Sequence, residues 1–235
     1  VAEHTMALIL ALAKRLPESV DRVRKNEFYP EGLTGFDLHN KIIGVIGAGN
    51  IGANVVRYAK GFGMKILAYD AHQNSDLAKE LGFEYVDLDT LISRSDIITL
   101  HLPYMEATHH ILNRGNLSKV KKNVIIINTA RGGLIETDAL FDGLKSGQIG
   151  GAGLDVLEEE GFLKEELELL YKDTHTETDF KVALENHLMA HLPNVIITPH
   201  NAFNTHEALE RIILKTIDNI IFSAQSSGDV AVVLS

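Results

Sequence analysis

Arginine, histidine and clustered glutamate occur where short apolar runs of the sequence end. Arg131 follows the apolar run Val124–Ile127 and the polar step Asn128–Ala130, and two glycines come directly after it. His200 follows the run Val195–Thr198, with a proline immediately before it. A guanidinium can hold a carboxylate through two parallel hydrogen bonds, and an imidazole exchanges protons near neutral pH. This combination predicts a site that binds a small acid and transfers a proton to or from it.

Both side chains also have structural interpretations. Arg131 could instead pair with a carboxylate of the following helix, such as Glu136 or Asp138, and its position alone does not decide between the two. His200 is one of 11 histidines, so its setting after a strand is what selects it. The adjacent pair His109–His110 offers no third ligand, and because we expect neighbouring rings to diverge, we predict no metal site. The histidines without a comparable setting are His4, His39, His72, His101, His175, His187, His191 and His206.

Three consecutive glutamates, Glu158, Glu159 and Glu160, follow the apolar stretch GAGLDV. They either form a solvated acidic turn or include a carboxylate that reaches His200 and holds its ring. A nearby negative charge raises the pKa of a histidine and keeps it protonated. Spacing alone does not choose among the three glutamates.

A glycine-rich turn predicts a bound dinucleotide. The stretch KIIGVIGAGNIG places Gly47, Gly49 and Gly52 in a G-x-G-x-x-G pattern between a predicted strand and a predicted helix. The first glycine permits a tight turn, the second lets a pyrophosphate approach the backbone, and the third lets the helix pack closely on the strand. Free N–H groups at the N-terminus of the helix would then bind the phosphates. The alternative is a tight turn without a ligand.

Asp70 ends the next predicted strand, MKILAYD, at the spacing that dinucleotide-binding domains require, about twenty residues after the glycines. A carboxylate there accepts hydrogen bonds from the ribose hydroxyls and repels the 2′-phosphate of NADP. We therefore predict NAD as the cofactor. The structural alternative is that Asp70 only caps a loop.

The elements that position these residues alternate along the chain. Continuous apolar runs are typical of strands buried on both faces, and their alternation with helical stretches predicts an α/β, Rossmann-type doubly wound parallel sheet of about seven strands with helices on both faces. The predicted strands are 42–46, 65–69, 84–86, 96–100, 123–127, 152–156 and 195–198. The predicted helices are 50–62, 75–81, 87–94, 114–120, 137–146, two pieces within 158–191, and a last helix over 205–224.

Composition narrows the class of function. The chain has 235 residues and a net charge of −10, without a basic stripe, which argues against nucleic acid as a partner. No run is long enough to cross a membrane. The sequence has no cysteine, which excludes disulfide and thiolate chemistry and fits a cytoplasmic protein. The opening stretch VAEHTMALILALAKRL predicts a buried helix without a cap, so we expect the sequence to begin inside an element with a further segment upstream.

Five separated stretches resemble one family. GVIGAGNIG, LISRSDIITLHLP, INTARGGLIETDAL, GAGLDV and TPHNAF follow one another as they do in the D-isomer-specific 2-hydroxyacid dehydrogenases, and within that family the chain is most similar to the D-lactate dehydrogenases. The resemblance implies NAD-dependent reduction of a small 2-oxo acid, foremost pyruvate, to the D-2-hydroxy acid. It implies an NAD-binding domain over 1–204, with the opening helix crossing between two lobes, and a helix and tail over 205–235 that return to an N-terminal substrate lobe absent from this sequence. It also suggests a homodimer through the opening helix.

The resemblance also assigns roles to single residues. It implies that Arg131 binds the substrate carboxylate and polarises its carbonyl, that His200 is the acid/base, and that Glu160 partners this histidine. It places Phe203 in the substrate wall. The implied cofactor contacts are Asn50 and Ile51 at the pyrophosphate, Asp70 at the adenosine ribose, Leu102, Pro103, Thr108, Thr129, Ala130 and Arg131 along the dinucleotide, and Asp155 near the nicotinamide amide.

Other functions remain open at this point. A second enzyme of the same family would reduce 2-oxoisocaproate, glyoxylate or hydroxypyruvate instead of pyruvate. A non-enzymatic NAD-sensing module on the same fold is a different class of function, and the retained set of Arg131, Glu160 and His200 argues against it. A dinucleotide-binding domain with unrelated chemistry is disfavoured because the five stretches agree with the family in order.

Overall fold

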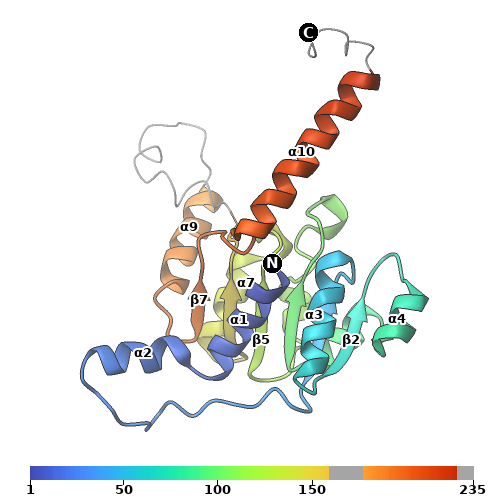
Figure 1. Cartoon of the computed structure of the whole chain (residues 1–235). Helices are drawn as coiled ribbons and strands as arrows, with labels where there is room; N and C mark the ends of the chain where they lie inside the picture. Colours follow the sequence, from blue (N-terminus) through green and yellow to red (C-terminus); the bar gives the residue numbers. More distant parts are fainter. Residues whose placement is uncertain (159–176, 227–235) are drawn as a thin grey trace. The chain divides into compact units, whose positions relative to one another are not determined.

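The structure of the protein, a computed structural model, describes residues 1–158 and 177–226, with side chains described over 1–158 and 180–222 (Figure 1). It divides into two units, Val1–His200 and Asn201–Ser235. The first unit contains the sheet, and the second contains the last helix. Among the described residues, no helix is both long and apolar enough to cross a membrane.

A seven-stranded sheet forms the centre of the first unit (Figure 1). The strands run in the order β3-β2-β1-β4-β5-β6-β7, and every pairing is parallel. The order reverses between β1 and β4, the switch point at which such sheets bind ligands. The predicted fold is confirmed. The strands are β1 (Ile42–Ile46), β2 (Lys65–Tyr69), β3 (Glu84–Tyr85), β4 (Ile97–Leu100), β5 (Val124–Asn128), β6 (Ile149–Leu154) and β7 (Val195–Ile197).

Helices cover both faces of the sheet because successive residues of each strand point to opposite sides. Ile125 and Ile127 of β5 belong to a buried cluster with α1 and α3, whereas Val124 and Ile126 belong to a second cluster with α5, α6, α7 and α9. Burial of both faces accounts for the continuous apolar runs. The helices are α1 (Ala2–Ala13), α2 (Leu16–Arg24), α3 (Asn50–Gly61), α4 (Ser75–Leu81), α5 (Leu88–Arg94), α6 (Arg114–Leu117), α7 (Thr137–Ser146), α9 (Glu177–Met189) and α10 (His206–Ser226).

The opening helix ends earlier than the sequence predicts. The sequence predicts one helix through Leu16, but α1 ends at Ala13, and Arg15 adopts a left-handed φ of 50° before α2 begins. Pro17 explains the break, because a proline ring clashes with the carbonyl of the residue four positions earlier, here Ala13. That carbonyl instead accepts the N–H of Phe36. The apolar side chains of α1 are buried against its own unit, whereas α2 has no buried residue.

Strand β6 begins three residues before its predicted start. The sequence did not indicate a strand over its first half, Ile149–Gly151, because glycine is typical of loops rather than strands. One glycine in the second half of the strand makes room for α1, because a Cβ atom on Gly153 would lie 3.0 Å from the Cβ of Leu8. Gly153 therefore lets α1 lie close to the sheet, and α1 in turn carries polar residues to the edge where the strands end.

Candidate active site

The predicted site residues of the first unit follow strands that are all parallel, so they gather at one edge of the sheet. The glycine turn follows β1, Asp70 follows β2, and Arg131 comes after β5. Asp155 follows β6 and His200 comes after β7. Residues from five strands thus converge at the carboxyl edge.

The glycine turn has the geometry that a dinucleotide needs. Gly47 has a left-handed φ of 97°, and its N–H donates to the Tyr69 carbonyl at 2.8 Å. A Cβ on Gly52 would collide with the Gly47 carbonyl oxygen, whereas the space around Gly49 is open. Helix α3 has no side-chain cap, so its first N–H groups are available to an anion. These features fit a pyrophosphate over Gly49.

Asp70 braces this turn. Its carboxylate accepts the N–H of Ala48 and the N–H of His72, each at 2.8 Å. Asp70 therefore does cap the loop, as the structural alternative predicted. A carboxylate has about four lone-pair sites, so ribose hydroxyls can still be accepted by the same group.

Arg131 is exposed at the end of β5, in a turn held by a side chain of that strand. Asn128 donates its Nδ2 to the Arg131 carbonyl at 2.8 Å and accepts the Ala130 N–H at 3.1 Å. The carboxylates considered as structural partners are engaged elsewhere: Glu136 accepts the backbone N–H of Arg114 at 2.6 Å, and Asp138 pairs with Lys181 at 3.0 Å. Arg131 donates to the Ala130 carbonyl at 2.6 Å, and across the described residues no carboxylate pairs with it.

His200 lies in a turn fixed to the neighbouring strand end. Its backbone has a left-handed φ of 51°, and its N–H donates to the carbonyls of Asp155 and Thr198, each at 2.9 Å. Glu160, its predicted partner, lies outside the described residues. Glu158 is described, and both of its carboxylate oxygens are bound, one to His110 Nε2 at 2.6 Å and one to Thr137 Oγ1 at 2.7 Å. The contacts of the Glu158 carboxylate are thus with His110 and Thr137 and not with His200.

His101 corrects one expectation about the histidines. It directly follows β4 at the same edge of the sheet, so the setting of His200 is not unique. Burial lowers the pKa of His101 to about 3. Its Nε2 lies 3.0 Å from Thr99 Oγ1. A ring that stays neutral at pH 7 cannot deliver a proton as an imidazolium, so His101 does not compete with His200 as an acid.

A buried polar network that the sequence did not predict supports the turn of His200. The carboxylate of Asp155 is 1% exposed and accepts Thr198 Oγ1 at 2.5 Å. His4 Nε2 lies 3.0 Å from the same hydroxyl and 3.5 Å from Asp155 Oδ1. Helix α1 thus reaches the ends of β6 and β7 through His4. The available signal was a histidine within an otherwise apolar, buried helix, because polar groups in such positions need partners.

The pair His109–His110 also differs from its prediction. The rings do not diverge but stack with their centroids 3.7 Å apart, because His110 has a left-handed φ of 47° that turns the chain back. In the part of the chain that the structure describes, no group of three His, Cys, Asp or Glu side chains could hold a metal ion.

The remaining predicted cofactor residues lie along the same edge or form the loop after β4. Thr108 closes this loop by donating to the Pro103 carbonyl at 2.7 Å and accepting the Met105 N–H at 2.9 Å. Phe203 belongs to the second unit and is exposed. Asn50 and Ile51 are exposed at the start of α3, Leu102 and Ala130 are half-buried, Pro103 is exposed, and Thr129 is buried.

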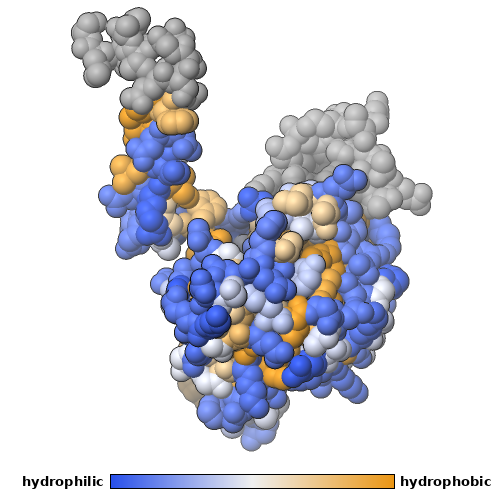
Figure 2. All heavy atoms as spheres, turned by 90° about the vertical axis from the view of Figure 1, so that its right-hand side faces the viewer, coloured by the Kyte–Doolittle hydropathy of each residue, from blue (hydrophilic) through white to orange (hydrophobic). Residues whose placement is uncertain are grey.

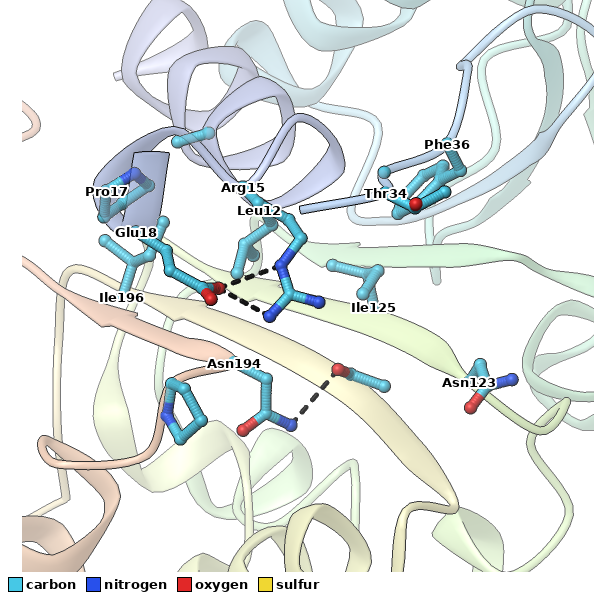
Figure 3. Close-up of a pocket in the computed structure, with 14 residues that line it drawn as sticks. Leu12, Arg15, Pro17, Glu18, Thr34, Phe36, Asn123, Ile125, Asn194 and Ile196 are labelled. Atoms are coloured by element: carbon cyan, nitrogen blue, oxygen red, sulfur yellow. Dashed lines mark hydrogen bonds and ion pairs between the residues drawn. The ribbon is translucent and has the colours of Figure 1, made fainter. Parts of the chain in front are cut away.

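A pocket of about 480 Å³ lies at the opposite edge of the sheet (Figure 3). Asn123 and Asn194, which precede β5 and β7, line it together with the first residues of α2. The guanidinium of Arg15 pairs with Glu18 in this pocket, with Nε 2.9 Å from the carboxylate (Figure 3). None of the predicted site residues lines it, so the convergent chemistry belongs to the carboxyl edge.

Comparison with known proteins identifies similar chains. Residues 6–202 match the family model described as D-isomer specific 2-hydroxyacid dehydrogenase, NAD binding domain. A 2-hydroxyacid dehydrogenase homolog of Haemophilus influenzae is 42% identical over 220 residues, 94% of this chain and 64% of that protein. The D-lactate dehydrogenase of Escherichia coli is 40% identical over 220 residues, again 94% of this chain and 64% of that protein.

A solved structure is similar over nearly the whole chain. The D-lactate dehydrogenase from Aquifex aeolicus, complexed with NAD and lactic acid, has a TM-score of 0.86 and 42% identity, and the match covers 97% of this chain and 66% of that chain. The chain spans 64% of the length of the two curated relatives above.

Proposed function

The chain belongs to the D-isomer specific 2-hydroxyacid dehydrogenases and carries their NAD-binding domain, and from this premise we propose that the complete protein reduces a small 2-oxo acid with NADH, foremost pyruvate to D-lactate. One observation carries the proposal. Arg131 is exposed at the sheet edge where the glycine turn and His200 also lie, and within the described residues no carboxylate pairs with it. A guanidinium that has no carboxylate partner among the described residues suits the carboxylate of a ligand at this position.

The chemistry follows from the roles of the chain's residues. Bound NADH supplies the hydride that the carbonyl carbon of the substrate accepts. In the proposal, Arg131 fixes the substrate carboxylate by two hydrogen bonds, so that one face of the carbonyl meets the cofactor. His200 donates a proton to the carbonyl oxygen, which becomes the hydroxyl of the product. Glu160 steadies the protonated ring.

The cofactor site fits NAD better than NADP. Asp70 follows β2 beside the glycine turn, where a 2′-phosphate would meet its negative charge. We expect direct titration of the complete protein to give a dissociation constant for NADH at least about tenfold lower than for NADPH. The variant Asp70→Ala should lose this preference, and should also bind NADH less tightly because Ala48 loses its acceptor. Tighter binding of NADPH by the unmodified protein would overturn the assignment.

The substrate is tested by comparing 2-oxo acids. We expect the complete protein to oxidise NADH with the highest kcat/KM for pyruvate among pyruvate, glyoxylate, hydroxypyruvate and 2-oxoisocaproate. A higher kcat/KM with another acid would reassign the substrate within the family. NADH binding without turnover of any of the four would support an NAD-sensing binding module instead.

The second unit supports a two-lobed enzyme. Apolar side chains lie exposed along α10, including Ile213, Ile217 and Ile220 (Figure 2). A helix of this composition needs a partner surface. We propose that residues 205–235 return to a substrate lobe outside this sequence, and that closure of two lobes excludes water during the reaction.

We also propose that the protein is a cytoplasmic homodimer that pairs through the region of α1 and α2. Helix α1 is buried within its own unit, so its apolar surface does not need a second chain to cover it. The exposed apolar face of α2 does indicate a partner surface. Leu16, Val20 and Val23 lie on one face of α2 and are exposed. A cytoplasmic location fits a chain without cysteine.

Sedimentation of the complete protein tests the dimer. We expect the mass of two chains at micromolar concentration, because an exposed apolar face favours self-association. A charge on that face, Val20→Glu, should shift the equilibrium toward one chain, while Asp21→Asn on the same helix should leave it unchanged. A single-chain mass for the unmodified protein would reject the dimer.

A further inference from the structure

His110 and Glu158 form a hydrogen-bonded pair that the proposed mechanism does not use. His110 Nε2 lies 2.6 Å from Glu158 Oε1, and the two side chains are 29% and 15% exposed. The second carboxylate oxygen accepts Thr137 Oγ1 at 2.7 Å, and the Glu158 carbonyl accepts Asn186 Nδ2 at 2.8 Å. Glu158 therefore ties together the loop after β4, the start of α7 and helix α9, which is more than a solvated acidic turn requires.

His110 also contacts the turn that carries Arg131. Its backbone N–H donates to the Gly133 carbonyl at 2.9 Å, while its side chain binds Glu158. His110 thus joins the turn after β5 to the turn after β6. Its left-handed φ of 47° is uncommon for a residue other than glycine, and such a conformation persists only where the surroundings fix it.

The two turns that His110 joins lie in direct contact. A Cβ on Gly132 would collide with the Leu157 carbonyl group and with the backbone nitrogen of Glu158. The residue directly after Arg131 therefore lies against the Leu157–Glu158 backbone. Any shift of this segment would displace the turn from which the Arg131 side chain projects.

We propose that His110 and Glu158 are a positioning pair that holds the Arg131 turn in the orientation required to bind the carboxylate of a 2-oxo acid. The inference rests on the proposed role of Arg131. The loop after β4 has its own closure through Thr108 and the Pro103 carbonyl, so loss of the pair leaves the cofactor contacts of that loop in place. The pair therefore acts more strongly on binding of the acid substrate than on binding of NADH.

The test measures binding of oxamate, a 2-oxo acid analogue that is not reduced, to the complex of the complete protein with NADH. In His110→Leu we expect the oxamate dissociation constant to rise by roughly tenfold or more, because displacement of a positioning group by about 1 Å has effects of this size. The NADH dissociation constant should stay within about threefold. His110→Gln, whose amide can still donate to Glu158, should restore oxamate binding to within about threefold of the unmodified protein.

His109→Leu is the matched control. His109 stacks on His110 and its Nδ1 lies 3.1 Å from the Tyr104 hydroxyl, but it does not bind Glu158. We expect its oxamate binding to be unchanged. The inference is wrong if His110→Leu binds oxamate normally, if His110→Gln fails to restore binding, or if NADH affinity falls as much as oxamate affinity.

The same experiment separates this inference from the proposed function. Oxamate binding does not require turnover. If the protein reduces no 2-oxo acid, yet His110→Leu weakens oxamate binding and His110→Gln restores it, the reductase is rejected and the positioning pair is supported. If the unmodified protein reduces pyruvate, but His110→Leu and His110→Gln have the same oxamate dissociation constant, only the positioning pair is rejected. Failure of the unmodified protein to bind oxamate at all would overturn the role of Arg131 and the pair with it.

Discussion

Replacing Arg131 by glutamine is expected to lower kcat/KM for pyruvate by about 10²- to 10³-fold in the complete protein, because a charged, two-bonded contact with the substrate is lost. The geometry supports a local effect. Asn128 holds the Arg131 turn through backbone atoms, and these contacts do not involve the guanidinium. The turn should keep its shape in the variant, and the NADH dissociation constant should change by less than about threefold.

Arg131→Lys tests whether the fork or the charge matters. Lysine keeps the positive charge but offers a single ammonium group instead of two parallel donors. Compared with Arg131→Gln, we expect Arg131→Lys to reverse part of the rise in KM but little of the fall in kcat, because the substrate is held but less well oriented. Arg114→Lys is the matched control, since Arg114 pairs with Asp138 and Asp142 and has no proposed contact with the substrate. Equal activity of Arg131→Gln and the unmodified protein would reject the carboxylate clamp.

Removing the imidazole of His200 is expected to lower kcat for pyruvate reduction by roughly 10²- to 10⁴-fold, the range that a positioned acid contributes. The substitution His200→Asn suits this position better than alanine, because asparagine tolerates the left-handed φ of 51°. The bonds from the backbone N–H to the Asp155 and Thr198 carbonyls do not depend on the side chain. NADH binding should therefore remain close to that of the unmodified protein in His200→Asn and in His200→Ala.

His101→Asn provides the control for His200. His101 also follows a strand at the same edge, but burial lowers its pKa to about 3, so we do not expect it to supply the proton. Its replacement should affect stability more than kcat, since the ring is desolvated beside Thr99. If His101→Asn abolishes reduction and His200→Asn does not, the assignment of the acid is wrong.

The sequence predicts the fold well where an element depends on local pattern. Strands β1 and β2 and helices α4 and α7 have the predicted bounds, because their apolar or amphipathic runs end at turn-forming residues. Prediction is weaker where tertiary packing overrides local composition. Gly150 and Gly151 are typical of a loop, yet they belong to β6, where Gly151 pairs with Ile125 of the neighbouring strand β5. The break between α1 and α2 is encoded by Pro17, whose ring is incompatible with a helix that continues through the preceding turn.

The candidate site divides in the same way. Arg131, His200 and the three glycines follow strands, and parallel strands bring their ends together, so sequence order alone predicts their proximity. The contacts that support them join distant segments. His4 reaches Thr198 across 194 positions, and His110 reaches Glu158 across 48. No local pattern contains such pairs, and for this reason Glu158 was not separated from its two neighbours by the sequence.

We propose that this domain belongs to an enzyme that reduces pyruvate to D-lactate with NADH. The most direct test incubates the complete protein with pyruvate and NADH and determines the chirality of the lactate formed. We expect D-lactate, with one NADH oxidised for each molecule formed, and loss of this product in Arg131→Gln and His200→Asn. Formation of L-lactate or a racemate, or no oxidation of NADH by a protein that binds it, would show that the proposed reaction is wrong.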